Sequence, residues 1–179
     1  MGTTIQETTA IFKEANIHFD VDEDLDLIRS LWSRGESTVT LVVFVLEDGE
    51  LVQLRAPTLL QVDDDANKPL LFRAMLQMAY EIRLVQFEYD PADGEVSTCI
   101  DIALEDGKLT SAQLLRCCAV LLDVAFLAHK RLTTILETGK DPALDSEDVD
   151  EEEAEQRQSQ LDAMAKLAAL IRRGGGGEA

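Results

Sequence analysis

The residues of this chain that could carry chemistry are three cysteines, two histidines and two runs of aspartate. Cys117 and Cys118 are adjacent, which does not readily allow an unstrained disulfide, and Cys99 makes the count odd. The adjacent pair lies in an apolar run from Leu114 to Leu127, where a free cysteine commonly behaves as a small buried hydrophobe. A redox or metal-binding thiol pair would need further Cys or His ligands nearby. We therefore expect the cysteines to be structural.

The histidines do not form a recognisable catalytic or metal-binding set. His18 and His129 lie far apart in the sequence, and each has apolar neighbours, so each is interpreted as a half-buried amphipathic residue. The sequence contains no glycine-rich phosphate loop ahead of its C-terminal glycines and no motif that pairs a nucleophile with a base. The sequence therefore predicts no catalytic residue, no bound metal and no cofactor, and favours a non-enzymatic protein.

The aspartate runs suggest one alternative function. Asp20–Asp26 resembles the start of a calcium-binding loop, but Leu25 stands where that loop needs glycine and Leu31 where it needs a bidentate glutamate. Asp63–Asp65 are expected to serve the N-terminus of the following helix. If the two runs converged, they could bind Mg²⁺ or Ca²⁺. The alternative is thus a carboxylate-based, divalent-metal-dependent enzyme or a metal-binding protein.

Charge and length restrict the class of protein further. The chain has 179 residues, with 35 Asp plus Glu against 16 Lys plus Arg, a formal net charge of −19. This charge repels nucleic-acid phosphates, so we expect no direct binding of nucleic acid. Neither a membrane span nor a secretory signal is recognisable, so we expect a cytoplasmic protein that does not bind membranes.

The first half of the chain alternates one helix with several strands. A helix is expected from Thr3 or Thr4 to about Asn16, and a short strand over Ile17–Val21. Leu27–Trp32 is either a strand, which we prefer, or a short helical turn. Thr38–Leu46 and the segment LVQLRAP form a predicted β-hairpin with Asp48-Gly49 in its turn. We expect Pro57 to end that hairpin, because proline cannot donate to a β-ladder.

The second half predicts a helix, a hairpin and a long helix. The helix covers Asn67–Ile82, and the hairpin pairs Arg83–Tyr89 with Glu95–Leu104. Thr110 and Gln113 form a capping-box signature for a helix that extends to about Leu136. That helix is apolar around nearly its whole circumference and must be covered on more than one side. The predicted fold class is α+β, an antiparallel β-sheet flanked by helices in the order α-β-β-β-α-β-β-α.

The composition changes near residue 141, which predicts three parts. Residues 1–140 form the folded domain, 141–160 an acidic flexible linker, and 161–179 a short amphipathic helix with a glycine-rich tail. An isolated helix of this length is unstable, so it binds either its own domain or another molecule. If it binds another molecule, the chain is an adaptor in which this helix is the working part.

Four segments of the chain resemble the YbjN family of bacterial proteins, described as sensory transduction regulators. They are the helix ending in Asn16-Ile17-His18-Phe19, the strand pair TVTLVVFVLEDGELVQLRAP, the passage MAYEIRLVQFEYDPADGEV, and DIALEDGKLTSAQLLRCC at the start of the long helix. The resemblance covers residues 3 to about 138. It implies a fold like that of type III secretion chaperones, and a small cytosolic dimer that binds protein segments and has no enzymatic activity.

The predicted function is therefore a chaperone-like or regulatory module, a homodimer that binds segments of partner proteins. An exposed sheet face or groove, made by the first hairpin and the first helix, is expected to accept an apolar peptide, while acidic residues at its rim select basic or unfolded partners. The candidate contacts to the partner are exposed apolar residues: Trp32, Phe44, Leu54, Leu59 and Leu60. The dimer is expected to form through a long helix or a sheet edge, because the apolar surface exceeds what one sheet face covers. The candidate interface residues are Leu115, Leu122 and Phe126.

Overall fold

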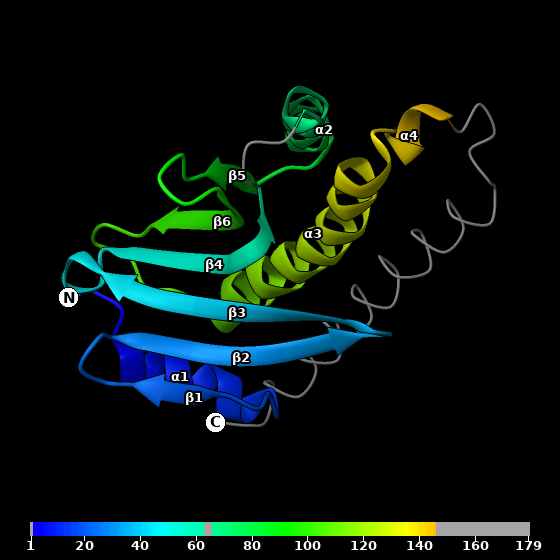
Figure 1. The fold of residues 1–179 in the computed structure, drawn as a ribbon. Coiled ribbons are helices and arrows are strands. Elements are labelled where there is room, and N and C mark those ends of the chain that lie inside the picture. The colour runs from blue at the N-terminus through cyan, green and yellow to red at the C-terminus, as the bar shows by residue number, and fades with distance from the viewer. Residues whose placement is uncertain (1, 63–65, 146–179) are drawn as a thin grey trace. The chain divides into compact units, whose positions relative to one another are not determined.

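The computed structural model describes residues 2–62 and 66–145 of the chain (Figure 1). Met1–Pro142 form one compact unit, and a second begins at Ala143, of which only the first residues are described. Residues 63–65 and nearly all of the predicted linker and terminal helix lie outside the described residues. The helices are α1 (Ile5–Glu14), α2 (Lys68–Glu81), α3 (Ser111–Thr138) and the short α4 (Pro142–Asp145), with a 3₁₀ turn η1 (Glu47–Gly49). The strands are β1 (Asp20–Asp22), β2 (Leu27–Arg34), β3 (Ser37–Leu46), β4 (Leu51–Gln61), β5 (Gln86–Tyr89) and β6 (Glu95–Ala103).

The strands form one six-stranded antiparallel sheet in the order β1-β2-β3-β4-β6-β5. This confirms the predicted α+β class, and it confirms β2 as a strand. The short strand expected over Ile17–Val21 is displaced toward the C-terminus and becomes β1, which pairs with β2 from Asp20 to Asp22. With β1 included, the sheet has six strands, one more than the five in the predicted order of elements.

Two helices start at capping boxes that the sequence contains. At α1, the backbone N–H of Glu7 donates to the Thr4 side chain over 3.2 Å, and the Thr4 N–H donates to the Glu7 carboxylate over 3.1 Å. At α3, Thr110 and Gln113 make the same reciprocal pair, as predicted. These contacts satisfy backbone donors that a helix start leaves without partners. Gly139 ends α3 in the left-handed conformation, with φ 68°.

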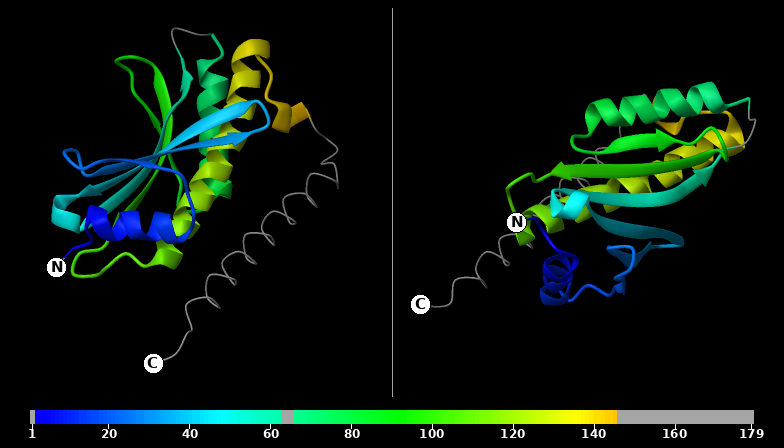
Figure 2. Two further views of the ribbon diagram at one scale, coloured as in Figure 1. Left: turned by 90° about the horizontal axis from the view of Figure 1, so that it is seen from below. Right: turned by 90° about the vertical axis from the view of Figure 1, so that its left-hand side faces the viewer.

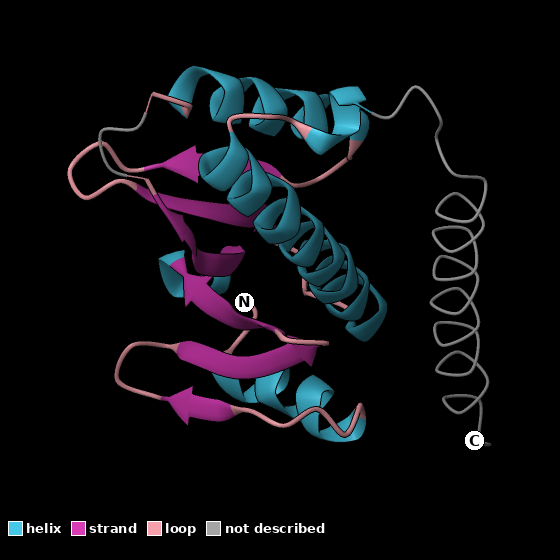
Figure 3. Ribbon diagram, turned by 45° about the vertical axis from the view of Figure 1, so that its right-hand side comes forward, coloured by secondary structure: helices cyan, strands magenta, loops and turns pink. Residues whose placement is uncertain are grey.

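The helices cover one face of the sheet. α3 packs across β3, β4 and β6, α1 packs against β2, and α2 lies beside α3 and β5 (Figures 2 and 3). By length and composition alone α3 could cross a membrane, but half of its most apolar stretch is buried inside the folded unit. Core helices of soluble proteins show the same composition, and α3 contributes Leu114, Leu121, Leu132 and Ile135 to the core.

The prediction that Pro57 ends the fourth strand is wrong. β4 continues to Gln61, and its register with β6 shifts between Ala56 and Leu60. Pro57 lies in this irregular stretch, where a strand can tolerate a residue without an N–H. Thr58 follows with a positive φ of 48°, and its hydroxyl donates to the Glu95 carboxylate over 3.0 Å.

A buried ion pair fixes the end of the folded unit. The Arg131 guanidinium on α3 donates to both carboxylate oxygens of Asp141, over 2.8 and 2.7 Å, and to Gln77 of α2 over 2.9 Å. Arg131 is 8% exposed and Asp141 3%. The bidentate geometry supplies the hydrogen bonds that a buried charge needs. Through Arg131, Asp141 is therefore linked to α3 directly and to α2 by way of Gln77.

Two glycines with positive φ allow a matched test of the β5–β6 turn. A Cβ at Gly94 would lie 2.2 Å from the Val62 carbonyl oxygen, whereas a Cβ at Gly35 would meet nothing within 4 Å. We expect Gly35→Ala to destabilise the protein by roughly 1–2 kcal/mol, the cost of left-handed backbone. Gly94→Ala should cost at least about 2 kcal/mol more, because Val62 must also move. Urea unfolding midpoints measure both, and equal losses would contradict this account of Gly94.

Candidate protein-binding surface

The sheet has a second face that no described helix covers. On β4 the side chains alternate: Val52, Leu54 and Ala56 are fully buried toward α3, whereas Gln53 and Arg55 point to the opposite side. Residues directly opposite each other on neighbouring strands share a face, so the register extends this division across all strands. We call the uncovered side the open face.

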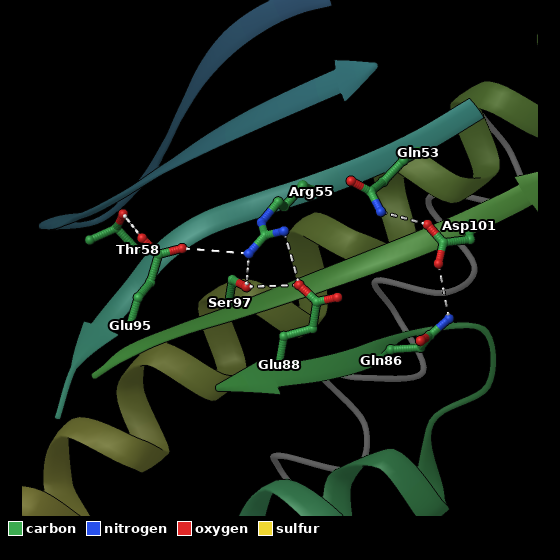
Figure 4. Close-up of polar contacts among 8 residues, drawn as sticks. All are labelled: Gln53, Arg55, Thr58, Gln86, Glu88, Glu95, Ser97 and Asp101. Carbon is green, nitrogen blue, oxygen red and sulfur yellow. Dashed lines mark hydrogen bonds and ion pairs between the residues drawn. The ribbon is translucent and has the colours of Figure 1, made fainter. Parts of the chain in front are cut away.

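Arg55 is the centre of a polar network on the open face (Figure 4). Its guanidinium lies 3.0 Å from the Glu88 carboxylate on β5 and 3.7 Å from that of Glu95 on β6. It also donates to the Ser97 hydroxyl over 2.9 Å, and Ser97 donates to Glu88 over 3.3 Å. These contacts join β4, β5 and β6 through their side chains.

Asp101 is a second acidic group of the open face, and its partners are neutral (Figure 4). Its carboxylate accepts hydrogen bonds from the Gln53 amide over 2.8 Å and from the Gln86 amide over 3.5 Å. These contacts thus include three carboxylates and one guanidinium, that of Arg55, which pairs with Glu88 and Glu95. This half of the open face carries an excess of negative charge.

The other half of the open face, on β2 and β3, carries several apolar side chains among polar ones. Phe44 lies opposite Gln53 in the register and opposite Leu27 on its other side. Leu27 is 4% exposed and Phe44 is half-buried, while Leu31 on the same face is 70% exposed. The exposed Arg29 lies between Leu27 and Leu31 on this face. Leu27, Leu31, Val42 and Phe44 thus form an apolar strip, interrupted by Arg29, beside the acidic network.

The thiols are held in their protonated form. Burial raises the pKa of the Cys99 thiol to about 12, with further contributions from the negative charges of Glu88 and Asp101. Burial also raises the pKa of Cys117, and it raises that of Cys118 to about 12. All three are free and buried, which agrees with the structural role expected from the sequence. A thiol with a raised pKa is a poor nucleophile at neutral pH.

The thiol environment gives a direct prediction. At pH 8, a pKa near 12 leaves Cys99 and Cys118 protonated, and burial raises the pKa of Cys117 as well, so the folded protein should react slowly with a thiol-specific disulfide reagent. In 8 M urea the ordinary pKa returns and all cysteines become accessible, so we expect a rate at least about a hundredfold higher. A cysteine that reacts equally fast in both conditions would contradict the described burial.

The structure places the candidate partner contacts in different environments. Trp32, Phe44 and Leu60 are half-buried. Leu54 is fully buried and Leu59 is 4% exposed, so the expected exposure of these two residues is wrong. Leu54 faces α3, and the carbonyl of Leu59 lies 2.8 Å from His129 Nδ1 on that helix. The sequence offered no element to cover Leu59, because the covering helix begins about fifty residues later.

The candidate dimer residues on α3 are largely covered within one chain. Leu122 is 5% exposed and Phe126 8%, and the Arg34 guanidinium lies 4.7 Å from the centre of the Phe126 ring. Leu115 is half-buried. The apolar circumference of α3 is thus covered by the sheet and by α2. A contact between these residues and a second copy of the chain stays a prediction.

The two most exposed apolar residues of the described chain lie on α2, and a further exposed leucine lies just after it; the sequence did not predict the exposure of these three. Leu76 is 73% exposed, Tyr80 92% and Leu84 52%. The buried stripe of α2 consists of Leu71, Ala74, Met75 and Met78. Leu76 and Tyr80 are apolar residues off that stripe, and this was the signal that could have identified them.

The first aspartate run forms a strand and a turn. Asp20 and Asp22 belong to β1, and the Asp22 carboxylate accepts the Leu25 N–H over 3.2 Å. Among residues 2–62 and 66–145, no group of three or more His, Cys, Asp or Glu side chains is placed to hold a metal ion. The second run, Asp63–Asp65, lies outside the described residues, so its convergence with the first stays a prediction.

Comparison with solved structures shows a shared fold. YbjN from E. coli has a TM-score of 0.56 and 10% identity, over 74% of this chain and 93% of that one. A chain of the HopA1-SchA chaperone-effector complex has a TM-score of 0.52 and 16% identity, over 70% of this chain and 94% of that one. A chain of the ExsC-ExsE complex has a TM-score of 0.54 and 19% identity, over 74% of this chain and 97% of that one. No family model and no curated protein matches the sequence. The chain therefore has the YbjN-like, type III secretion chaperone-like fold expected from the resemblance.

Proposed function

We propose that this protein is a non-enzymatic, chaperone-like or regulatory module that binds segments of partner proteins on its open face. The observation that carries the proposal is an apolar strip beside an acidic network, on a sheet face that no described helix covers. Surfaces of this kind mark protein-binding sites. The same fold in a chaperone-effector complex supports a protein partner. The raised thiol pKa values disfavour nucleophilic catalysis by the cysteines.

The chemistry of the open face suggests the chemistry of its partner. Apolar side chains of a bound segment would contact Leu31 and Phe44, which removes apolar surface from water. Basic side chains of the same segment would approach Glu88 and Asp101, where negative charge is in excess. Electrostatic complementarity of this kind selects partners and speeds their association. Free cysteines and the absence of disulfides among the described residues agree with a cytoplasmic site of action.

Binding can be tested with synthetic peptides. A labelled peptide that alternates leucine with lysine should bind more tightly than one that alternates leucine with glutamate. Leu31→Asp should weaken binding of the lysine peptide by about tenfold, because it places a charge on the apolar strip. Leu25→Asp is the matched control, since Leu25 is 60% exposed in the β1–β2 turn. Fluorescence anisotropy gives both affinities, and equal effects of the two variants would argue against the open face.

We also propose that the protein acts as a homodimer, which rests on the exposed apolar residues of α2 and the loop after it. The chain mass is 19.8 kDa, so light scattering coupled to size-exclusion chromatography should give about 40 kDa at micromolar concentration. A single species at the mass of one chain would count against the homodimer. That result would leave the proposed binding of a partner on the open face unaffected, because that proposal does not depend on a second copy.

A further inference from the structure

One row of side chains crosses five strands of the open face. Neighbours in this row lie opposite each other in the register: Asp22 and Leu27, Leu27 and Phe44, Phe44 and Gln53, and Gln53 and Asp101. We call these five residues the cross-strand row. Adjacent strands are about 4.8 Å apart, so the four steps from β1 to β6 place Asp22 and Asp101 about 19 Å apart. The row therefore begins and ends at a carboxylate, with Phe44 in the middle.

The two terminal carboxylates of the row accept hydrogen bonds from neutral donors. Asp22 accepts the backbone N–H of Leu25 over 3.2 Å, and Asp101 accepts the amides of Gln53 and Gln86 over 2.8 and 3.5 Å. No ion pair among the described residues includes Asp22 or Asp101. A cation from another molecule would therefore meet a carboxylate at each end of the row.

A cleft lies at the Asp22 end of the row. Its volume is about 470 Å³, and its lining includes Asp20, Asp22, Glu23, Asp24, Leu27 and Arg29. Four carboxylates against one guanidinium make the cleft negative. Sites for whole small molecules have volumes of about 300–1,000 Å³, so this cleft has room for one lysine or arginine side chain.

The rows on either side of the cross-strand row differ in charge. On one side, Arg29 lies opposite Val42, and Val42 lies opposite Arg55. Arg29 is exposed, so it repels a basic segment that shifts toward it. On the other side, Leu46 lies opposite Leu51, and both are half-buried. Charge therefore favours the cross-strand row over the arginine row as the path of a basic, apolar segment.

The length of the row matches an extended segment of seven residues. In an extended chain alternate side chains point to the same side, and six residue steps span about 20 Å. Basic side chains at positions i and i+6 would then lie at Asp22 and Asp101, and apolar side chains at i+2 and i+4 would lie on either side of Phe44. A helix is about 10 Å wide, whereas alternate residues of a strand are only about 7 Å apart, so a helix centred on the row would also approach Arg29.

We infer that the open face binds an extended segment of a partner protein that crosses the strands along the cross-strand row, with a basic residue at each end and apolar residues beside Phe44. This inference rests on the proposed function and specifies the direction, length and charge pattern of the bound segment. Carboxylates at both ends of the row select this spacing among apolar, basic segments.

Two labelled peptides of identical composition test the spacing. Both contain two lysines and two leucines among serines, and in both the leucines are the second and fourth residues after the first lysine. The second lysine follows the first by six residues in one peptide and by ten in the other. The spacing of six should bind at least about threefold more tightly, because only it meets both carboxylates. Fluorescence anisotropy with the full chain measures both affinities, and equal values would overturn the cross-strand row and leave the proposed function standing.

Substitutions at the two ends of the row test the pairing. Asp22→Asn and Asp101→Asn should each weaken binding of the spacing-six peptide about threefold, because each removes one carboxylate. The amide oxygen of asparagine can still accept the hydrogen bonds within the chain, and circular dichroism checks the fold. Asp106→Asn, an exposed residue of the turn after β6, is the matched control for the loss of one negative charge. Equal effects of all three variants would overturn the inference.

Other occupants of the row give different results. If a second copy of the chain covers it, the apparent affinity for the peptide falls as the protein concentration rises. If the chain's own C-terminal segment covers it, replacing two basic residues that are six apart, Lys166→Glu with Arg172→Glu, raises the affinity for the peptide. Either result overturns the inference, which predicts no change in both cases. Failure of every peptide to bind, the alternating leucine–lysine peptide included, would overturn the proposed function as well.

Discussion

The rest of this structure depends on a sheet that is covered on one face only. Because side chains alternate along each strand, covering one face with α1 and α3 assigns every second residue to the core and its neighbours to the open face. The residues left on the open face must satisfy their own polar groups without a helix above them. Arg55 does this for β4, β5 and β6 by contacting Glu88, Glu95 and Ser97.

Charge then divides the surface into two kinds of contact. The open face places apolar side chains next to three carboxylates that share the network with one guanidinium, and the proposed partner is an apolar segment with basic residues. The exposed apolar residues on and after α2, Leu76, Tyr80 and Leu84, have arginines beside them, and the proposed homodimer rests on this surface. The two surfaces lie on different elements, so the proposed partner binding and the proposed dimerisation need not compete.

The shared fold reaches across structures that are only 10 to 19% identical to this chain. At such identity, the comparison shows a shared fold and no shared site. The fold therefore supplies surfaces, while the residues described here decide which partner chemistry each surface favours.

Local signals in the sequence were sufficient to place most elements. The cap at Thr3 or Thr4, the capping box at Thr110 and the β-branched and aliphatic run of β3 predicted their elements because each signal acts within a few residues. Exposure could not be predicted in the same way. Leu59 is buried and Tyr80 is exposed because α3, far along the chain, covers one and not the other. The tertiary structure alone decided which apolar residues remain available for binding, since burial depends on contacts between distant segments.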